Sequence, residues 1–173
     1  MGEAESDFSA FAESGMGAET DAYIAENATV RHALTVAEGV SVAEPVILEV
    51  TLDAAHPTAL TSLSVDAKAG SSLTIVQVLR GDAEHGAAAS LTRIRAGENA
   101  QVRLVQIQLL GDNARRWNAA AVEEGRNARV EQVRIELGGI LSACGTRAAL
   151  SAAKSEYDLD AVYFGSGSAL LDY

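Results

Sequence analysis

The chain has 173 residues, of which 48% are hydrophobic and only 5% aromatic, and its formal net charge is −11. This hydrophobic content is enough for the core of one domain. The negative charge argues against a binding surface for nucleic acid or for an anionic membrane.

The cysteine count and the apolar runs narrow the class of protein further. Cys144 is the only cysteine, so an internal disulfide framework is excluded and a reducing compartment is favoured. No apolar run approaches the roughly 20 residues that cross a membrane. The N-terminus also lacks the basic start of a signal peptide. We therefore expect a cytoplasmic protein without a membrane contact.

The N-terminal residues differ in composition from the rest of the chain. Residues 1–22 are rich in acidic residues, Gly, Ser and Ala, and we expect them to form an acidic tail or one short helix around Ser6–Glu13. A more regular pattern begins at Tyr23, so residues 23–173 are predicted to form one domain. Within it, residues 33–50 are predicted to form two strands around a turn, because Gly39 and Pro45 interrupt the apolar pattern.

The middle of the chain repeats itself. The segment AGENAQVRLVQIQLLGD (Ala96–Asp112) is echoed by EGRNARVEQVRIELGG (Glu124–Gly139), and a fainter copy occupies Ala69–Asp82. A fixed period of this size is typical of stacked repeats. The glycines that open the three copies, 27 and then 28 residues apart, are Gly70, Gly97 and Gly125.

Each copy contains a long stretch in which polar and apolar residues alternate. Residues 102–110 and 130–137 have this period of two, which predicts strands with one buried and one wet face. The polar residues of these strands are expected on the wet face. They are Arg103, Gln106, Gln108, Arg129, Gln132, Arg134 and Glu136.

Shorter strands are predicted between the long ones. The candidates are Ser90–Ile94, Trp117–Val122 and Thr146–Leu150. A unit of one long and one short strand in roughly 28 residues cannot bury its apolar face alone, so it must stack on its neighbours. This favours a β-solenoid over a β-sandwich.

Several segments carry a family resemblance when they are read in order. EGVSVAEPVIL (Glu38–Leu48) is followed by SSLTIVQVLRG, AGENAQVRLVQIQLLGD, RRWNAAAVEEGRNARVEQVRIELGG and LDAVYFGSGSALLDY. This series resembles successive coils of the core of the SufB/SufD family, the iron–sulfur cluster assembly proteins of the SUF system, over residues 23–173. The resemblance implies an all-β fold, a right-handed parallel β-helix. It also implies a core domain that is incomplete at its C-terminal end, because family members continue beyond the LLDY segment.

The resemblance implies an assembly scaffold and not an enzyme. Subunits of this family pair through their β-helices, bind the ABC-type ATPase SufC through C-terminal helices, and help to build or hold a nascent cluster. ATP hydrolysis belongs to SufC, and this chain has no G-x-x-x-x-G-K-[ST] phosphate-binding motif. The expected partners are a SufC-type ATPase and a SufB/SufD-type paralogue or a second copy of the chain.

Cys144, in LSACGTR, is the candidate cluster ligand. Thiolates are the usual ligands of iron–sulfur clusters, and a cluster needs about four of them. The chain alone is therefore expected to bind no cofactor, and Cys144 would share a transient cluster across a subunit interface in the full assembly. The alternative is that Cys144 is a small buried hydrophobic residue.

Other chemically suggestive residues have simpler explanations. His32, His56 and His85 are scattered and show no ligand spacing, which is typical of surface or loop histidines. Asp158 and Asp160 project to one face of a predicted strand, as a metal or acid/base pair or as part of a solvated face.

Trp117, the only tryptophan, follows two arginines. It is interpreted either as an interface anchor or as a residue that packs over a coil.

Two further functional classes stay open. A structural or oligomerising β-helix fragment is one, because an uncapped solenoid leaves unpaired backbone groups at its end. The other is a polysaccharide-cleaving β-helix enzyme, which would need clustered Asp, Arg or Lys on adjacent coils and usually a secretion signal. Neither feature is evident in the sequence.

Overall fold

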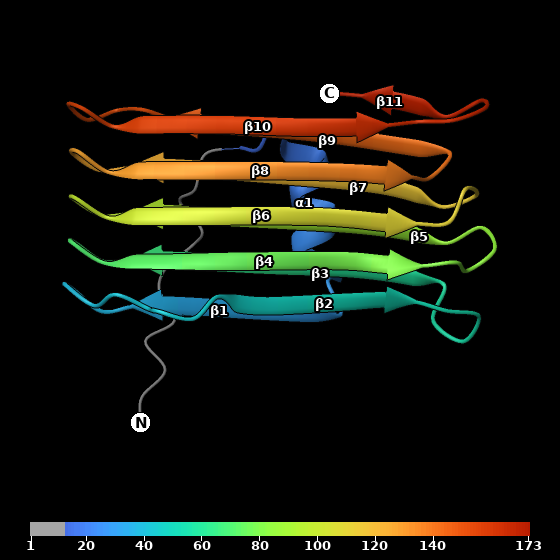
Figure 1. The fold of residues 1–173 in the computed structure, drawn as a ribbon, viewed down its shortest axis with the longest axis horizontal. Helices are drawn as coiled ribbons and strands as arrows, with labels where there is room; N and C mark the ends of the chain where they lie inside the picture. The colour runs from blue at the N-terminus through green and yellow to red at the C-terminus, as the bar shows by residue number, and fades with distance from the viewer. Residues whose placement is uncertain (1–12) are drawn as a thin grey trace.

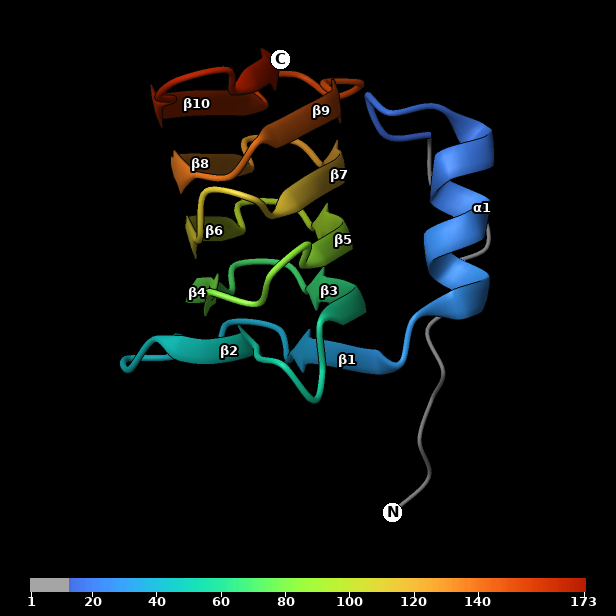
Figure 2. The same ribbon diagram turned by 90° about the vertical axis from the view of Figure 1, so that its right-hand side faces the viewer.

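The computed structural model describes residues 13–173 and consists mostly of parallel β-strands in two facing sheets (Figures 1 and 2). The six-stranded sheet contains β1 (Val30–Val36), β3 (Thr58–Ala67), β5 (Ala87–Ala96), β7 (Arg115–Glu124), β9 (Leu141–Ala149) and β11 (Leu170–Asp172). The five-stranded sheet contains β2 (Val46–Leu52), β4 (Ser72–Gly81), β6 (Gln101–Leu110), β8 (Arg129–Gly138) and β10 (Glu156–Phe164).

The strands alternate between the two sheets along the chain, so each coil contributes one strand to each sheet (Figure 1). Strands within a sheet pair in parallel with the strand one coil away. The result is a parallel β-solenoid of about five turns, which confirms the predicted fold class. The strands predicted to be short are instead full-length, since β5 and β7 have ten residues each.

The register of the strands corrects the predicted alignment of the repeats. Gly70 donates its backbone N–H to Glu98, and it lies at the same turn position as Asn99, 29 residues later, and not as Gly97. Gly97 has a different role, because a Cβ there would lie 2.9 Å from the backbone nitrogen of Ala69. The positive-φ turn position recurs in successive coils at Gly39, Gly70, Asn99, Asn127 and Lys154.

The helix α1 (Ala18–Asn27) covers the outer face of the six-stranded sheet (Figure 2). Its Ile24 is buried against Leu91 and Ala119, which point outward from β5 and β7. In the first turn of α1, the buried carboxylate of Asp21 accepts hydrogen bonds from the backbone and side chain of Ser14, which precedes the helix. Within residues 13–173, no helix is long and apolar enough to cross a membrane. The alternative helix predicted around Ser6–Glu13 falls on residues 1–12, outside the described residues apart from its last position.

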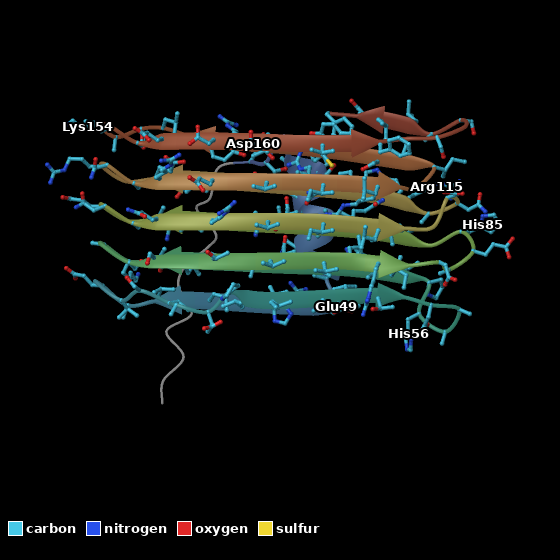
Figure 3. The ribbon with its side chains drawn as sticks, viewed as in Figure 1. Glu49, His56, His85, Arg115, Lys154 and Asp160 are labelled. Atoms are coloured by element: carbon cyan, nitrogen blue, oxygen red, sulfur yellow. The ribbon has the colours of Figure 1, made fainter. Side chains whose placement is uncertain are left out.

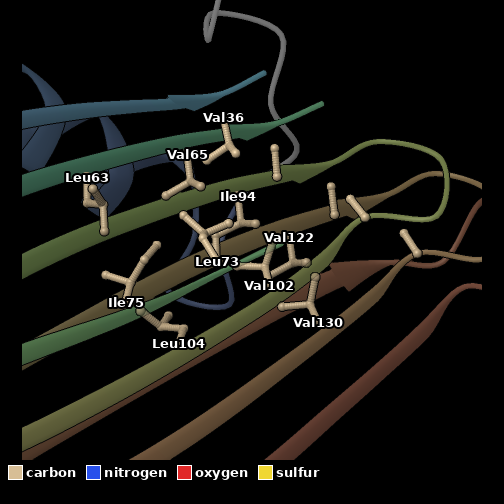
Figure 4. Close-up of a cluster of buried hydrophobic side chains, with 14 residues drawn as sticks. Val36, Leu63, Val65, Leu73, Ile75, Ile94, Val102, Leu104, Val122 and Val130 are labelled. Carbon is tan, nitrogen blue, oxygen red and sulfur yellow. The ribbon is translucent and has the colours of Figure 1, made fainter. Parts of the chain in front are cut away.

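Apolar side chains fill the two ends of the space between the sheets. The larger cluster lies where the strands of the five-stranded sheet begin, and it includes Leu73, Ile75, Val102, Leu104 and Val130 (Figure 4). A smaller cluster lies where those strands end. Polar residues occupy the interior between these two clusters.

We predict that Gly138→Ala destabilises the fold more than Gly39→Ala does. Both glycines have positive φ, which costs an alanine roughly 1–2 kcal/mol. A Cβ at Gly39 meets nothing within 4 Å, whereas one at Gly138 collides with the carbonyl oxygen of Leu110, adding about 1–3 kcal/mol. Urea unfolding of both variants measures the difference. Equal losses of stability would contradict the close stacking of the coils.

Candidate functional site: a buried polar network around Cys144

The polar residues of β6 and β8 point into the solenoid, which reverses the prediction that they face water. Gln106 and Gln108 are fully buried, whereas Leu109 is 44% exposed on the outer face. The strands begin with Val102 and Leu104 inside, and a strict period of two then carries the glutamines inward as well. In β8 the same alternation buries Gln132, Arg134 and Glu136. Of the predicted wet residues, Arg103 and Arg129 do lie on the outer face.

Hydrogen bonds between side chains explain how these amides are accommodated. Gln106 and Asn118, from opposite sheets, exchange two hydrogen bonds of 3.2 and 3.0 Å. Gln132 donates to Gln106 at 2.7 Å and accepts one of 2.6 Å from the hydroxyl of Tyr157. Ser90 donates to Asn118 at 2.9 Å. Buried amides that satisfy one another avoid the cost of an unpaired polar group.

The same interior holds charged groups. The guanidinium of Arg116 lies 3.2 Å from the carboxylate of Glu136, and both side chains are at least 95% buried. The hydroxyl of Ser142 donates a 3.0 Å hydrogen bond to Oε2 of Glu136, the same oxygen that lies 3.2 Å from Arg116. Arg134 donates to Thr146 at 2.7 Å, but its Nε has no partner among the described residues. The centre of the interior therefore contains two guanidinium groups and the carboxylate of Glu136.

Cys144 lies inside this network as a free, buried thiol. It is adjacent to Asn118 across the strand pair, and its Sγ is 3.9 Å from the hydroxyl of Ser142. Burial raises the pKa of Cys144 to about 11, and the carboxylate of Glu136 adds to the rise, while Arg134 and Arg116 oppose it. The thiol is therefore protonated at neutral pH.

The donor set does not fit a resident iron–sulfur cluster. Residues 13–173 contain no group of three or more His, Cys, Asp or Glu side chains placed to hold a metal ion. Cys144 offers one sulfur, whereas a cluster needs about four ligands. A cluster that meets this chain would be cargo with most of its ligands supplied elsewhere.

The structure keeps the three histidines apart. His56 and His85 lie in exposed loops, where His56 contacts Asp53 at 3.2 Å (Figure 3). His32 lies on β1, in a different part of the solenoid.

Asp158 and Asp160 are both exposed on β10, with the side chain of Asp160 on the outer face of the sheet (Figure 3). Asp158 accepts a 2.9 Å hydrogen bond from Arg129, so its carboxylate takes part in an ion pair with the neighbouring strand.

Trp117 lies outside the solenoid, where it lines a groove between α1 and the six-stranded sheet together with Tyr23 and Leu60. The indole thus packs next to the helix. A partner could also reach it through the groove, so both interpretations of this residue stay open.

Glu124 was not singled out from the sequence. It occupies the last inward position of β7, is only 3% exposed, and neither carboxylate oxygen has a hydrogen-bond partner among the described residues. Burial raises the pKa of Glu124 to about 7; the backbone of Glu156 opposes the rise, and the charges of Asp158 and Glu156 add to it. Every second residue of β7 points inward, and this alternation along the strand is the signal that would have identified Glu124 as a buried residue.

We predict that Glu136→Gln lowers the free energy of unfolding by about 3–5 kcal/mol, because it leaves the buried charge of Arg116 unpaired. The double variant Arg116→Met/Glu136→Leu should lose less than the single variant. The control is Glu98→Gln, which removes the exposed ion pair with Arg126 and should cost only about 0–1 kcal/mol. Similar losses for Glu136→Gln and Glu98→Gln in urea unfolding would contradict a buried pair.

We predict that Glu124→Gln stabilises the protein above neutral pH. The raised pKa means that the folded state holds its proton up to about pH 7, whereas the unfolded state ionises near 4.5. Stability should therefore fall in the wild type as the pH rises from 4.5 to 7, and the substitution removes this loss. Melting temperatures of both proteins should agree most closely near pH 4 and diverge by pH 8. A constant difference across this range would show that Glu124 is not the responsible group.

Comparison with protein families identifies the chain. Residues 50–173, more than half of the chain, match the family model described as "SUF system FeS cluster assembly, SufBD core domain". Neither the curated proteins nor the solved structures gave a significant match. The match includes β5 to β10, which supply the side chains of the buried network, and Cys144. The chain therefore belongs to the SufBD core family of the SUF system for iron–sulfur cluster assembly.

Proposed function

We propose that this chain is a scaffold subunit for iron–sulfur cluster assembly in a SUF-type system and that it acts with the SufC ATPase. The family match supports this proposal, since the SufBD core family is generally a non-catalytic scaffold subunit. The observation that carries it furthest in this chain is the position of the only thiol, which lies inside the solenoid among buried charged groups.

Cys144 would serve as one sulfur ligand for a cluster that is cargo. The charged groups that act on Cys144 are Arg116 and Arg134 against the one carboxylate of Glu136, so a thiolate would neutralise the surplus positive charge. The raised pKa keeps the proton on sulfur until a metal ion replaces it, because metal binding drives deprotonation of a cysteine. The remaining ligands would come from a partner subunit.

The position of Cys144 in the solenoid supports a shared site. It lies on β9, which is followed in the sheet only by the three residues of β11. The ring of Tyr173 stacks on Tyr163 at a centroid distance of 3.5 Å above this end of the interior. A partner that docks on this end coil would come within one strand of the thiol.

The proposed partners are a SufC-type ATPase and a SufB/SufD-type paralogue or a second copy of the chain, joined through the end coils. Within the described residues, β10 and β11 are edge strands of the two sheets, and an edge strand is a template for pairing with another chain. We also propose a cytoplasmic location, where the free thiol of Cys144 would stay reduced.

A structural or oligomerising role without cluster chemistry is the second candidate function. It is favoured by the exposed Leu170 and Tyr173 at the end coil.

We predict that Cys144→Ala abolishes most of the iron and sulfide bound after anaerobic reconstitution with the SufC-type ATPase and the paralogue from the same source. The control is Ser90→Ala, which removes a hydroxyl from the same inward row two coils away. Pull-down with the paralogue should succeed for the wild type and both variants. Unchanged iron loading in Cys144→Ala would remove the ligand role, and failure of the wild type to bind any partner would favour the purely structural role.

A further inference from the structure

A groove lies between α1 and the first residues of β3, β5 and β7, on the outer face of the six-stranded sheet. Thr20 and Tyr23 of the helix form one wall. The floor includes Leu60, Ala89 and Trp117, which lie side by side because the strands are in register. Its volume is about 670 Å³, within the range of roughly 300–1,000 Å³ that is usual for ligand-binding sites.

The helix covers only the neighbouring part of the sheet (Figure 2). Two residues further along β5 and β7, Leu91 and Ala119 are fully buried beneath Ile24. In the groove itself, Ala89 and Trp117 are only half-buried. Among residues 13–173, α1 and the sheet alone line the groove. The fold therefore leaves an aromatic and apolar surface accessible beside the helix.

The side chains of the groove favour a ligand with a positively charged group. Glu19 is the one charged side chain among the described residues that line it. The ring faces of Trp117 and Tyr23 also attract cations. Arg115 precedes Trp117 on the outer face of β7 and would repel a cation at that margin. A cation is therefore favoured at the wall formed by α1, beside Glu19 and Tyr23, with an apolar group over Trp117.

We propose that this Trp117 groove binds an extended segment of a partner protein in which an arginine or lysine lies next to an apolar residue. Tyr23 at the rim is 62% exposed, so the groove is too open to enclose a small molecule, which a ligand pocket normally buries by roughly 70–90%. From Leu60 to Trp117 the floor spans two strand spacings, about 9.6 Å, a length that three extended residues fill. Tryptophan and tyrosine are residues on which binding energy concentrates at interfaces. The net charge of −11 would also steer a basic segment toward the chain.

The Trp117 groove is separate from the proposed site of cluster chemistry. Trp117 lies on the outer face of β7, whereas Cys144 is buried inside the solenoid on β9. The groove also lies along β3, β5 and β7, and the end coil that the proposed function assigns to a partner begins beyond β9. This binding site therefore does not rest on the proposed function.

The first test selects random peptides displayed on phage against the full chain, with the variant Tyr23→Ala as the counter-target. Tyr23 is exposed, so this variant should fold normally. We expect the enriched peptides to share an arginine or lysine beside an apolar residue and to bind Tyr23→Ala about tenfold more weakly. No enrichment over the counter-target, or enriched peptides without a basic residue, would overturn the proposal. Enrichment only on a variant that lacks residues 1–12 would overturn it too, by assigning the groove to those residues.

The second test uses the fluorescence of Trp117, the only tryptophan of the chain. Titration with an enriched peptide should change its emission and saturate. Glu19→Gln should weaken binding by about threefold to fivefold, as expected for an exposed ion pair. The matched control is Glu26→Gln, on the same helix but outside the lining of the groove, which should bind as the wild type does. Equal affinities of Glu19→Gln and the wild type would overturn the assigned cation. Cys144→Ala should bind the peptide normally, so failure of this site and failure of the cluster role are distinguishable.

Discussion

The in-register stacking of parallel coils is the constraint on which the rest of the structure depends. Each strand hydrogen-bonds to the strand one coil away, so a position in one coil lies directly over the same position in the next. A turn that needs positive φ needs it in every coil, and Gly70, Asn99 and Asn127 meet this need in succession. Asn127 even donates a 2.7 Å hydrogen bond to Asn99 across the coils.

Stacking also decides what the interior can contain. Apolar columns at the two ends of the strands form the hydrophobic clusters, and polar columns between them bring amides and charges together. A polar residue is tolerated inside because the neighbouring coil or the facing sheet supplies its hydrogen-bond partner. Cys144 lies in this polar centre, which gives a single thiol an environment that an apolar core would not provide.

The repeat period, the strands and the solenoid could be predicted from the sequence, because alternation and a fixed spacing are local signals. The phase of the alternation could not. In residues 102–110 the choice between burying Ile107 and burying Gln106 depends on Asn118, a hydrogen-bond partner that comes from the other sheet. The sequence aligned Gly97 with Gly70, although the two occupy different turn positions. Gly70 is needed for positive φ, whereas Gly97 is needed because the neighbouring coil approaches it closely. The site was predicted only as an isolated cysteine, since its partners are assembled by the fold.

The most direct test of this account is the solvent accessibility of adjacent positions on β6. Gln106→Cys and Ile107→Cys, each in a Cys144→Ser background, are labelled with a maleimide at a protein concentration at which the chain is monomeric. The account predicts rapid labelling at position 107 and strong protection at position 106, since Gln106 is fully buried and Ile107 points outward. Rapid labelling at 106 with protection at 107 would contradict the polar interior and everything inferred from it.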